Sequence, residues 1–241
     1  LVACSAGALV ALLRGGTAVR VTAVGLLAVI WGGGAALRGV QWTAPAGAPL
    51  TVGLVQGAIP QDQKWLDRRR SLEAYDDLTN QVLGRRIVIW PEAALPVLAH
   101  QVEGHLGSLY RRAQAMGSDM VLGILRGDYA REEFHNSMLV LGEEYQWYDK
   151  RRLVPFGEFF PVPAFIRQWM KLMSLPYTDL TPGAADQPAL RAGGQKLGAT
   201  ICYEDAYGSE QLAVLREATL LVNITNDAWF GDSTAPHQHL E

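Results

Sequence analysis

The N-terminal part of the chain is almost uniformly apolar. No residue between Arg20 and Arg38 is charged. Because a helix needs roughly 20 apolar residues to cross a bilayer, we predict a membrane-spanning helix at about 21–38. The uncharged segment 1–13 predicts the end of a preceding span, so residues 1–40 form a membrane region. The alternative is a helix buried in a soluble core. A signal peptide is disfavoured because no positively charged segment opens the chain.

Two arginines flank the short loop between these apolar segments. Arg14 and Arg20 bound the sequence RGGTAVR, and short loops rich in Lys and Arg remain in the cytoplasm. The chain that follows the second span is then expected on the opposite face, which in a Gram-negative cell is the periplasm. The sequence therefore predicts a protein of the bacterial inner (cytoplasmic) membrane with a periplasmic domain.

Beyond the apolar region, short apolar runs alternate with amphipathic windows. Residues 41–49 are rich in Pro and small side chains (TAPAGAP) and are predicted to form a linker. The alternation that follows indicates an α/β layered fold in one domain, 50–241. The strand-like runs are 50–56, 86–90, 120–125, 136–142, 196–202 and 219–225.

Helical spacing of apolar residues marks several segments between these runs. After the first run, apolar side chains recur with a period near 3.6, at Trp65, Leu72, Tyr75, Leu78 and Val82. The segments 104–116 and 208–217 are predicted helices on the same grounds. Two others, 153–163 and 226–236, contain too many Pro, Gly and Asp residues for regular structure, and such loops often carry function.

Composition and charge narrow the function classes. The 241 residues are 49% hydrophobic and 19% charged, which suits a large domain with a sizeable core. The net charge is -3 and there is no long basic block, so a nucleic-acid partner is not expected. The two cysteines, Cys4 and Cys202, lie in segments of very different character. We therefore expect a free thiol at Cys202 rather than a disulfide.

Several common catalytic signatures are missing from the sequence. It has no G-x-S-x-G, P-loop, complete G-x-G-x-x-G or C-x-x-C motif, which argues against serine hydrolases, P-loop and Rossmann enzymes and zinc ribbons. The metal-like cluster His237, His239 and Glu241 is a weak signal, because H-x-H alone does not define a metal site. No cofactor is predicted.

Three reactive side chains each follow a strand-like run. Glu92 comes after RIVIWP, Lys150 after EYQWYD and Cys202 after KLGATI. Because strand ends at one edge of a sheet bring distant residues into one crevice, we expect the three to meet. Each alone also has an ordinary structural interpretation: a helix N-terminal acid, a solvated basic turn and a small buried hydrophobe, respectively.

Together the three residues suit attack on an acyl carbon. A cysteine is a strong nucleophile only as the thiolate, which gains from a neighbouring cation and base. Lys150 supplies the positive charge, and with a backbone N–H near Tyr203 it can stabilise the oxyanion formed from an ester or amide. Glu92 is then the general base.

The sequence motifs around these residues resemble those of the apolipoprotein N-acyltransferase branch of the nitrilase (carbon-nitrogen hydrolase) superfamily. They are WPEAALP (90–96), YDKRRLVPFGEFFP (148–161), ICYED (201–205) and NITNDAWFGDSTAPHQHLE (223–241). The words LVPFGE and NDAWFG, in this order after transmembrane spans, are typical of that branch. The resemblance covers about 41–241.

The resemblance implies an αββα nitrilase-type sandwich with a catalytic triad at Glu92, Lys150 and Cys202. The glutamate of LVPFGE, which supports the site in the family, maps to Glu158. Other positions that the family retains near its site are Tyr203, Glu204, Asn136 and Trp65. Because the family pattern continues beyond the residues matched here, we expect the sandwich to lack its C-terminal part.

The resemblance also implies a ping-pong reaction without a cofactor. Cys202 attacks the acyl ester of a membrane phospholipid, giving a thioester and a lysophospholipid. The N-terminal amine of a diacylglyceryl-cysteine lipoprotein, the acceptor, then takes the acyl chain. The nearest alternative is a membrane-anchored nitrilase-type amidase that hydrolyses a small C–N substrate. A non-enzymatic binding module with an inactive site is a second alternative.

Overall fold

A computed structural model describes residues 1–42, 44–59, 68–163, 165–166 and 179–240. The chain divides into two compact units, one comprising Leu1–Pro49 and the other Leu50–Glu241. Each unit has its own secondary structure.

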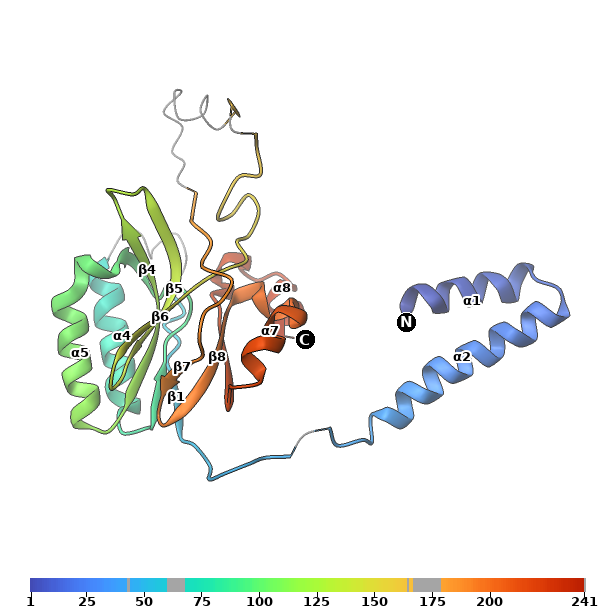
Figure 1. Cartoon of the computed structure of the whole chain (residues 1–241), viewed down its shortest axis with the longest axis horizontal. Helices are drawn as coiled ribbons and strands as arrows, with labels where there is room; N and C mark the ends of the chain where they lie inside the picture. The colour runs from blue at the N-terminus through green and yellow to red at the C-terminus, as the bar shows by residue number, and fades with distance from the viewer. Residues whose placement is uncertain (43, 60–67, 164, 167–178, 241) are drawn as a thin grey trace. The chain divides into compact units, whose positions relative to one another are not determined.

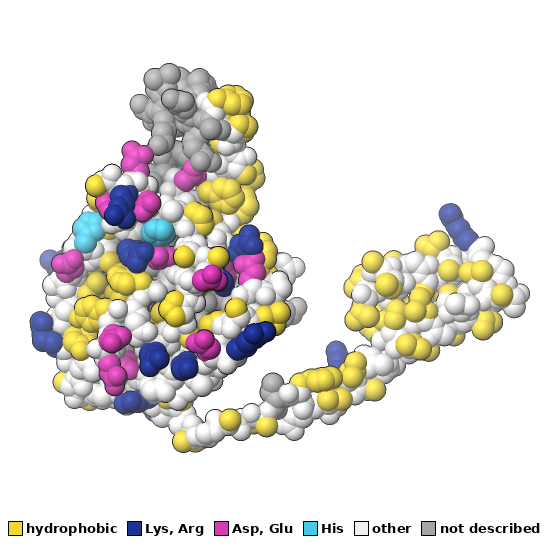
Figure 2. All heavy atoms as spheres, viewed as in Figure 1, with side chains coloured by type: hydrophobic (Ala, Val, Ile, Leu, Met, Phe, Trp, Pro, Cys, Tyr) yellow, Lys and Arg dark blue, Asp and Glu magenta, His cyan; other side chains and the backbone are white. Residues whose placement is uncertain are grey.

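The N-terminal unit is a pair of helices, α1 (Val2–Arg14) and α2 (Thr17–Leu37). The helices pack together, and Trp31 Nε1 donates a hydrogen bond to Ser5 Oγ at 3.2 Å. Within the described residues, α2 is the one helix long and apolar enough to cross a membrane, with a mean hydropathy of 1.6 over its most apolar window. Apolar side chains lie over the surface of this unit (Figure 2).

The larger unit contains a six-stranded mixed sheet. Its strands are β1 (Val52–Leu54), β2 (Ile87–Ile89), β3 (Leu95–Leu98), β4 (Asp119–Asp128), β5 (Glu133–Leu141) and β6 (Tyr145–Asp149). The order is β1-β2-β4-β5-β6, with β3 also paired to β4. Strands β1, β2, β3 and β4 run parallel, and β5 and β6 continue the sheet in antiparallel pairs.

A second sheet of three strands packs on the first. It consists of β7 (Leu190–Ala192), β8 (Gln195–Ile201) and β9 (Leu220–Ile224). Strand β8 is antiparallel to β7 and parallel to β9. Three short 3-10 helices, η1 (Ala99–Val102), η2 (Cys202–Ala206) and η3 (Asp227–Phe230), lie between the larger elements.

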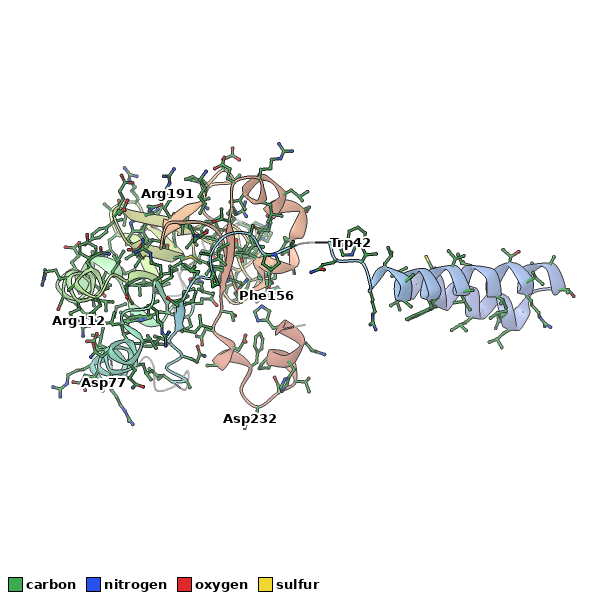
Figure 3. All side chains as sticks on the ribbon, turned by 90° about the horizontal axis from the view of Figure 1, so that it is seen from below. Trp42, Asp77, Arg112, Phe156, Arg191 and Asp232 are labelled. Carbon is green, nitrogen blue, oxygen red and sulfur yellow. The ribbon has the colours of Figure 1, made fainter. Side chains whose placement is uncertain are left out.

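Helices cover the outer faces of the two sheets (Figure 1). They are α4 (Arg68–Val82) and α5 (Glu103–Ala115) on the large sheet and α7 (Gly208–Leu215) on the small one. A last short helix is α8 (Ala235–Leu240). On the solvent side, Arg112 of α5 donates to Asp76 of α4 at 2.5 Å, and Asp77 and Arg112 lie on the outside of the unit (Figure 3).

The apolar runs of the central strands β4, β5 and β8 are buried on both faces, whereas β1 and β9 leave apolar side chains exposed on one face. On β4, Met120, Leu122 and Ile124 pack in the core under α4 and α5, whereas Val121 packs between the sheets. Because successive side chains of a strand point to opposite faces, a central strand needs apolar residues at every position. The helix–sheet–sheet–helix arrangement confirms the predicted nitrilase-type α/β fold.

Two strands and one helix end differ from the sequence-based expectations. Pro in β3 and Arg in the three-residue β7 interrupt the strand pattern, so neither strand was predicted. Helix α8 begins inside the segment 226–236 that was expected to be irregular, because Pro236 lies in its first turn, where a missing N–H costs no helical hydrogen bond. The segment 153–163 contains no helix or strand.

Candidate active site

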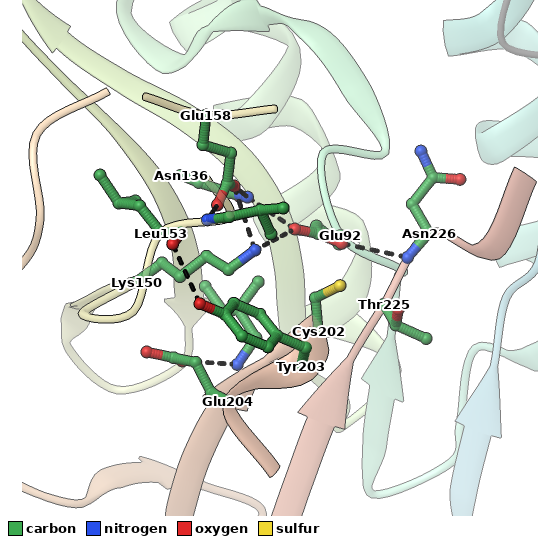
Figure 4. Close-up of polar contacts among 12 residues, drawn as sticks. Glu92, Asn136, Lys150, Leu153, Glu158, Cys202, Tyr203, Glu204, Thr225 and Asn226 are labelled. Atoms are coloured by element: carbon green, nitrogen blue, oxygen red, sulfur yellow. Dashed lines mark hydrogen bonds and ion pairs between the residues drawn. The ribbon is translucent and has the colours of Figure 1, made fainter. Parts of the chain in front are cut away.

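Glu92, Lys150 and Cys202 come together at one end of the two facing sheets (Figure 4). Glu92 lies in the loop after β2, Lys150 directly follows β6, and Cys202 directly follows β8. Two of these strands belong to the large sheet and one to the small sheet. The site is therefore assembled across the interface of the two sheets rather than within one.

The loop that carries Glu92 is fixed by its neighbours. Trp90 is fully buried, lies 4.8 Å from Tyr75 between ring centroids, and donates through Nε1 to Thr79 Oγ1 at 2.9 Å. The loop then passes so close to β4 that a Cβ at Gly123 would lie 2.6 Å from the Glu92 Cα. Glycine at position 123 is thus a requirement for the observed place of the Glu92 carboxylate.

Lys150 is the most enclosed of the three side chains, with 1% of its surface exposed. Its Nζ donates to Glu92 Oε1 at 3.1 Å and to Glu158 Oε1 at 3.0 Å. Its backbone N–H donates to the carbonyl of Asn136 at 2.8 Å, and its own carbonyl accepts from the N–H of Gly183 at 2.8 Å. Backbone and side chain are therefore both held in place.

The two carboxylates keep the Lys150 ammonium charged. Burial lowers the pKa of Lys150, but the negative charges of Glu92 and Glu158 raise it by more, so the pKa lies above its ordinary value. An ammonium has three N–H donors. The bonds to these two carboxylates use two of them, which leaves one donor for a ligand.

Asn136 links the two carboxylates on the other side. Its Nδ2 donates to Glu92 Oε1 at 2.6 Å and to Glu158 Oε1 at 2.8 Å. The second oxygen of Glu158 accepts from the backbone N–H of Val154 at 2.8 Å. Glu158, predicted as a support, therefore connects the Lys150 ammonium to the loop 153–163.

Cys202 is the first residue of η2, at the sharp turn that follows β8. Its φ of 56° is in the left-handed region, which is uncommon for a residue with a side chain. Asn223 Nδ2 donates to the Cys202 carbonyl at 2.8 Å and helps to hold the turn. The turn brings the half-buried thiol to the side of the Glu92 and Lys150 pair (Figure 4).

Burial raises the pKa of the Cys202 thiol to about 11, and the negative charge of Glu92 adds to the rise. The ammonium of Lys150, the hydroxyl of Thr225 and the backbone N–H of Tyr203 oppose it. The thiol is consequently protonated near neutral pH. A thiol in this state can attack a carbonyl carbon only if a base takes its proton.

The two residues after the cysteine stabilise the turn through contacts on opposite sides of it. Tyr203 donates its hydroxyl to the Leu153 carbonyl at 3.0 Å, which ties the turn to the loop 153–163. Glu204 is buried, and its side chain points away from the thiol (Figure 4). It accepts from the backbone N–H groups of Arg151, Arg152 and Ile201 and from the Tyr148 hydroxyl, at 2.7 to 3.0 Å.

Residues after β9 contribute contacts that the sequence did not single out. The backbone N–H of Asn226 donates to Glu92 Oε2 at 3.1 Å. Thr225 lies beside the Cys202 thiol (Figure 4), and its side chain lowers the pKa of that thiol. The strand-end rule that selected Glu92, Lys150 and Cys202 applies equally to β9. The polar run NITND at its end was the available signal.

Two of the sequence-based candidates fall outside the described residues, namely Trp65 and Glu241. In the part of the chain that is described, no group of three or more His, Cys, Asp or Glu side chains is arranged to hold a metal ion. His237 is exposed, and His239 lies 2.9 Å from Asp227 between Nδ1 and Oδ1. Both cysteines are free.

The fold is that of solved carbon-nitrogen hydrolases. The carbon-nitrogen hydrolase from Helicobacter pylori G27 aligns with a TM-score of 0.54 and 18% identity over 73% of this chain and 59% of that chain. An amidase from Nesterenkonia sp. aligns with a TM-score of 0.52 and 20% identity over 81% of this chain and 72% of its own. At these identities the similarity establishes the fold alone.

Sequence comparison defines the family. The carbon-nitrogen hydrolase family profile matches residues 51–241, and the chain belongs to this family. A Methylococcus capsulatus protein named apolipoprotein N-acyltransferase is 43% identical over 88% of this chain and 43% of its own length. A Chromobacterium violaceum protein of the same name is 39% identical over 100% of this chain and 47% of its own length. The chain thus spans just under half of these relatives.

Proposed function

We propose that the protein transfers an acyl chain from a membrane phospholipid, through a thioester on Cys202, to the N-terminal amine of a diacylglyceryl-cysteine lipoprotein. The observation that carries this proposal is the contact of Lys150 with both Glu92 and Glu158 beside the thiol. The names of the relatives that share 35 to 43% identity with the chain support the choice of substrates.

In the first half-reaction, Glu92 takes the thiol proton as the sulfur attacks the ester carbonyl. The protonated resting thiol calls for such a base. The remaining N–H of the Lys150 ammonium, together with the backbone N–H of Tyr203 beside the sulfur, stabilises the oxyanion. Collapse of the tetrahedral intermediate forms the thioester, and the lysophospholipid leaves with the proton from Glu92.

In the second half-reaction, the α-amine of the lipoprotein attacks the thioester. Glu92 accepts the amine proton and passes it to the sulfur, so Cys202 leaves as the thiol and Glu92 is again a base. Water must be kept from the thioester, since hydrolysis would convert the transferase into a phospholipase. The nucleophile, base and cation are all side chains of this chain, so the proposed reaction uses no metal or organic cofactor.

A membrane location suits two lipid substrates. We place α1 and α2 in the bacterial inner membrane, with the Arg14–Arg20 loop in the cytoplasm and the domain from residue 50 in the periplasm. The 21-residue length and apolar surface of α2 support this placement. Tethering replaces an encounter in bulk solution by a local one and so raises the effective concentration of both lipids.

The first test is intact-protein mass spectrometry after incubation with phospholipid vesicles. The expected result is one acyl chain bound to the protein, absent in Cys202→Ala and retained in Cys4→Ser. Acylation that persists in Cys202→Ala would refute the thioester.

The second test adds a diacylglyceryl-cysteine peptide to the acylated protein. We expect the acyl chain to move to the free amine of this peptide and to remain on the protein when the peptide is N-acetylated. Release of free fatty acid to water alone, at the same rate with either peptide, would favour a hydrolase over a transferase.

A further inference from the structure

The segment 223–227 spans the proposed nucleophile and the proposed base. Asn223 holds the Cys202 carbonyl, and the N–H of Asn226 holds Glu92 Oε2. Between them, the hydroxyl of Thr225 faces the thiol of Cys202 (Figure 4). The conformation of this segment therefore determines which hydrogen-bond donors lie beside Cys202 and Glu92.

His239 contacts this segment from α8. Its Nδ1 lies 2.9 Å from Asp227 Oδ1 and 3.5 Å from Thr225 Oγ1. Because an ionised carboxylate only accepts hydrogen bonds, Nδ1 carries a proton and donates it to Asp227. The hydrogen bond to Asp227 raises the pKa of His239, which is consistent with this direction. The His239 side chain is largely enclosed, with 17% of its surface exposed.

Asp227 and Cys202 compete for one hydroxyl proton. Thr225 Oγ1 donates to Asp227 Oδ1 at 3.3 Å, so the hydroxyl must turn from Asp227 to the sulfur when a thiolate forms. A hydroxyl has a single proton, so Thr225 cannot donate to Asp227 and to a Cys202 thiolate at once. Each carboxylate oxygen gains from a strong donor. When His239 donates to Asp227, the hydrogen bond from Thr225 to the same carboxylate contributes less to its stabilisation.

We infer that His239 is a positioning residue for Cys202: by donating to Asp227, it leaves the Thr225 hydroxyl free to stabilise the sulfur during attack. His239 also has a hydrogen-bond contact with the Cys202 backbone, but it touches no reacting atom, and the inference assigns its effect to Asp227 and Thr225. The inference rests on the proposed role of Cys202 as nucleophile. Its test uses neither lipid nor acceptor, so the result is independent of whether acyl transfer occurs.

Several charged side chains besides His239 surround the thiol. Glu92 and Lys150 face it directly, with Glu158 behind Lys150. On the side of η2 and α8, Asp205 lies 4.0 Å from His239 Nε2. A useful test must therefore separate loss of the Nδ1 donor from loss of the imidazolium charge.

Two substitutions make this separation. In His239→Asn, the side-chain amide takes the position of Nδ1 and keeps a donor without a charge. In His239→Gln, the amide takes the position of Nε2 and the donor to Asp227 is lost. His237→Gln, at an exposed position of the same helix, is the matched control.

The readout is the rate of Cys202 alkylation by iodoacetamide against pH, in a Cys4→Ser background that removes the exposed second thiol. We expect His239→Gln to react about fivefold more slowly at pH 9, as expected for loss of one hydrogen bond to the thiolate. His239→Asn and His237→Gln should react at the parent rate. Equal rates for His239→Gln and the parent, or a slow His239→Asn, would overturn the inference.

A double-mutant cycle with Thr225→Val tests the route. Without the hydroxyl, alkylation is expected to be slow already, and His239→Gln should slow it no further. A merely structural role of His239 predicts instead that the two effects multiply, and that result would overturn the inference. Urea unfolding of each variant identifies any loss of folded protein before the rates are compared.

Discussion

Lys150 Nζ lies 3.1 Å from Glu92 Oε1, and only 1% and 8% of the two side chains are exposed. This is a buried ion pair, with Glu158 as a second carboxylate 3.0 Å from the same nitrogen. Two acids around one ammonium leave a net negative charge in an enclosed place. Hydrogen bonds from Asn136, Val154 and Asn226 offset part of its desolvation.

Lys150→Met is expected to destabilise the folded domain by about 3 to 5 kcal/mol, because it leaves two buried carboxylates without their cation. It should also slow alkylation of Cys202, since the ammonium lowers the pKa of that thiol. Urea unfolding and the alkylation rate are the measurements. Lys196→Met, at an exposed position, is the control. A variant as stable as the parent would contradict the ion-pair account.

Gly123→Ala is expected to reduce acyl transfer strongly, because the new Cβ would meet the backbone at Glu92 and displace the carboxylate. A misplacement of about 1 Å at a reacting group can cost on the order of a hundredfold in rate. Gly104→Ala is the control, since its Cβ meets nothing within 4 Å and its helix gains stability. Parent-like transfer by Gly123→Ala would show that the loop tolerates the shift.

Glu204→Gln is expected to destabilise the domain by about 2 kcal/mol or more. The glutamate accepts three backbone N–H groups and the Tyr148 hydroxyl, and an amide would turn one acceptor into a donor facing donors. The pKa of Tyr148 lies above its usual value, mainly because the side chain is buried and secondly because of the negative charge of Glu204. Urea unfolding measures the loss, with exposed Glu217→Gln as control. No loss of stability would contradict this scaffolding role.

Strand ends could be predicted from sequence because the central strands are buried on both faces. Apolar runs such as RIVIW and KLGATI are visible without coordinates, and so are the reactive residues that follow them. The directions of the side chains are not visible. Glu204 was grouped with the site because it matches a position that the family retains there, yet its carboxylate binds backbone groups on the other side of the turn.

Contacts between distant loops could not be predicted for the same reason. Asn226 reaches Glu92 across 134 positions of sequence, through a backbone N–H that any residue could supply. His239 was noticed only as part of an H-x-H pattern, and its partner Asp227 follows from the way α8 folds back on η3. Such pairings depend on how loops pack, which a local pattern does not encode.

Glu92→Gln is expected to change two reactions of Cys202 in opposite directions. Burial is the largest cause of the raised pKa of the thiol, and the negative charge of Glu92 is the second. Removal of this charge should therefore lower that pKa from about 11. Alkylation at pH 8 should then become about tenfold faster, as the thiolate fraction rises. Acyl transfer should fall by roughly a hundredfold to ten-thousandfold, because the proposed general base is lost.

The opposite signs distinguish removal of a charge beside the sulfur from disruption of the site. A substitution that only disordered the site would slow transfer with no gain in thiol reactivity. Glu144→Gln, at an exposed position, should leave both rates unchanged. If Glu92→Gln slowed alkylation and transfer together, the carboxylate would not be acting on the sulfur as a charge, and another group would have to take the thiol proton.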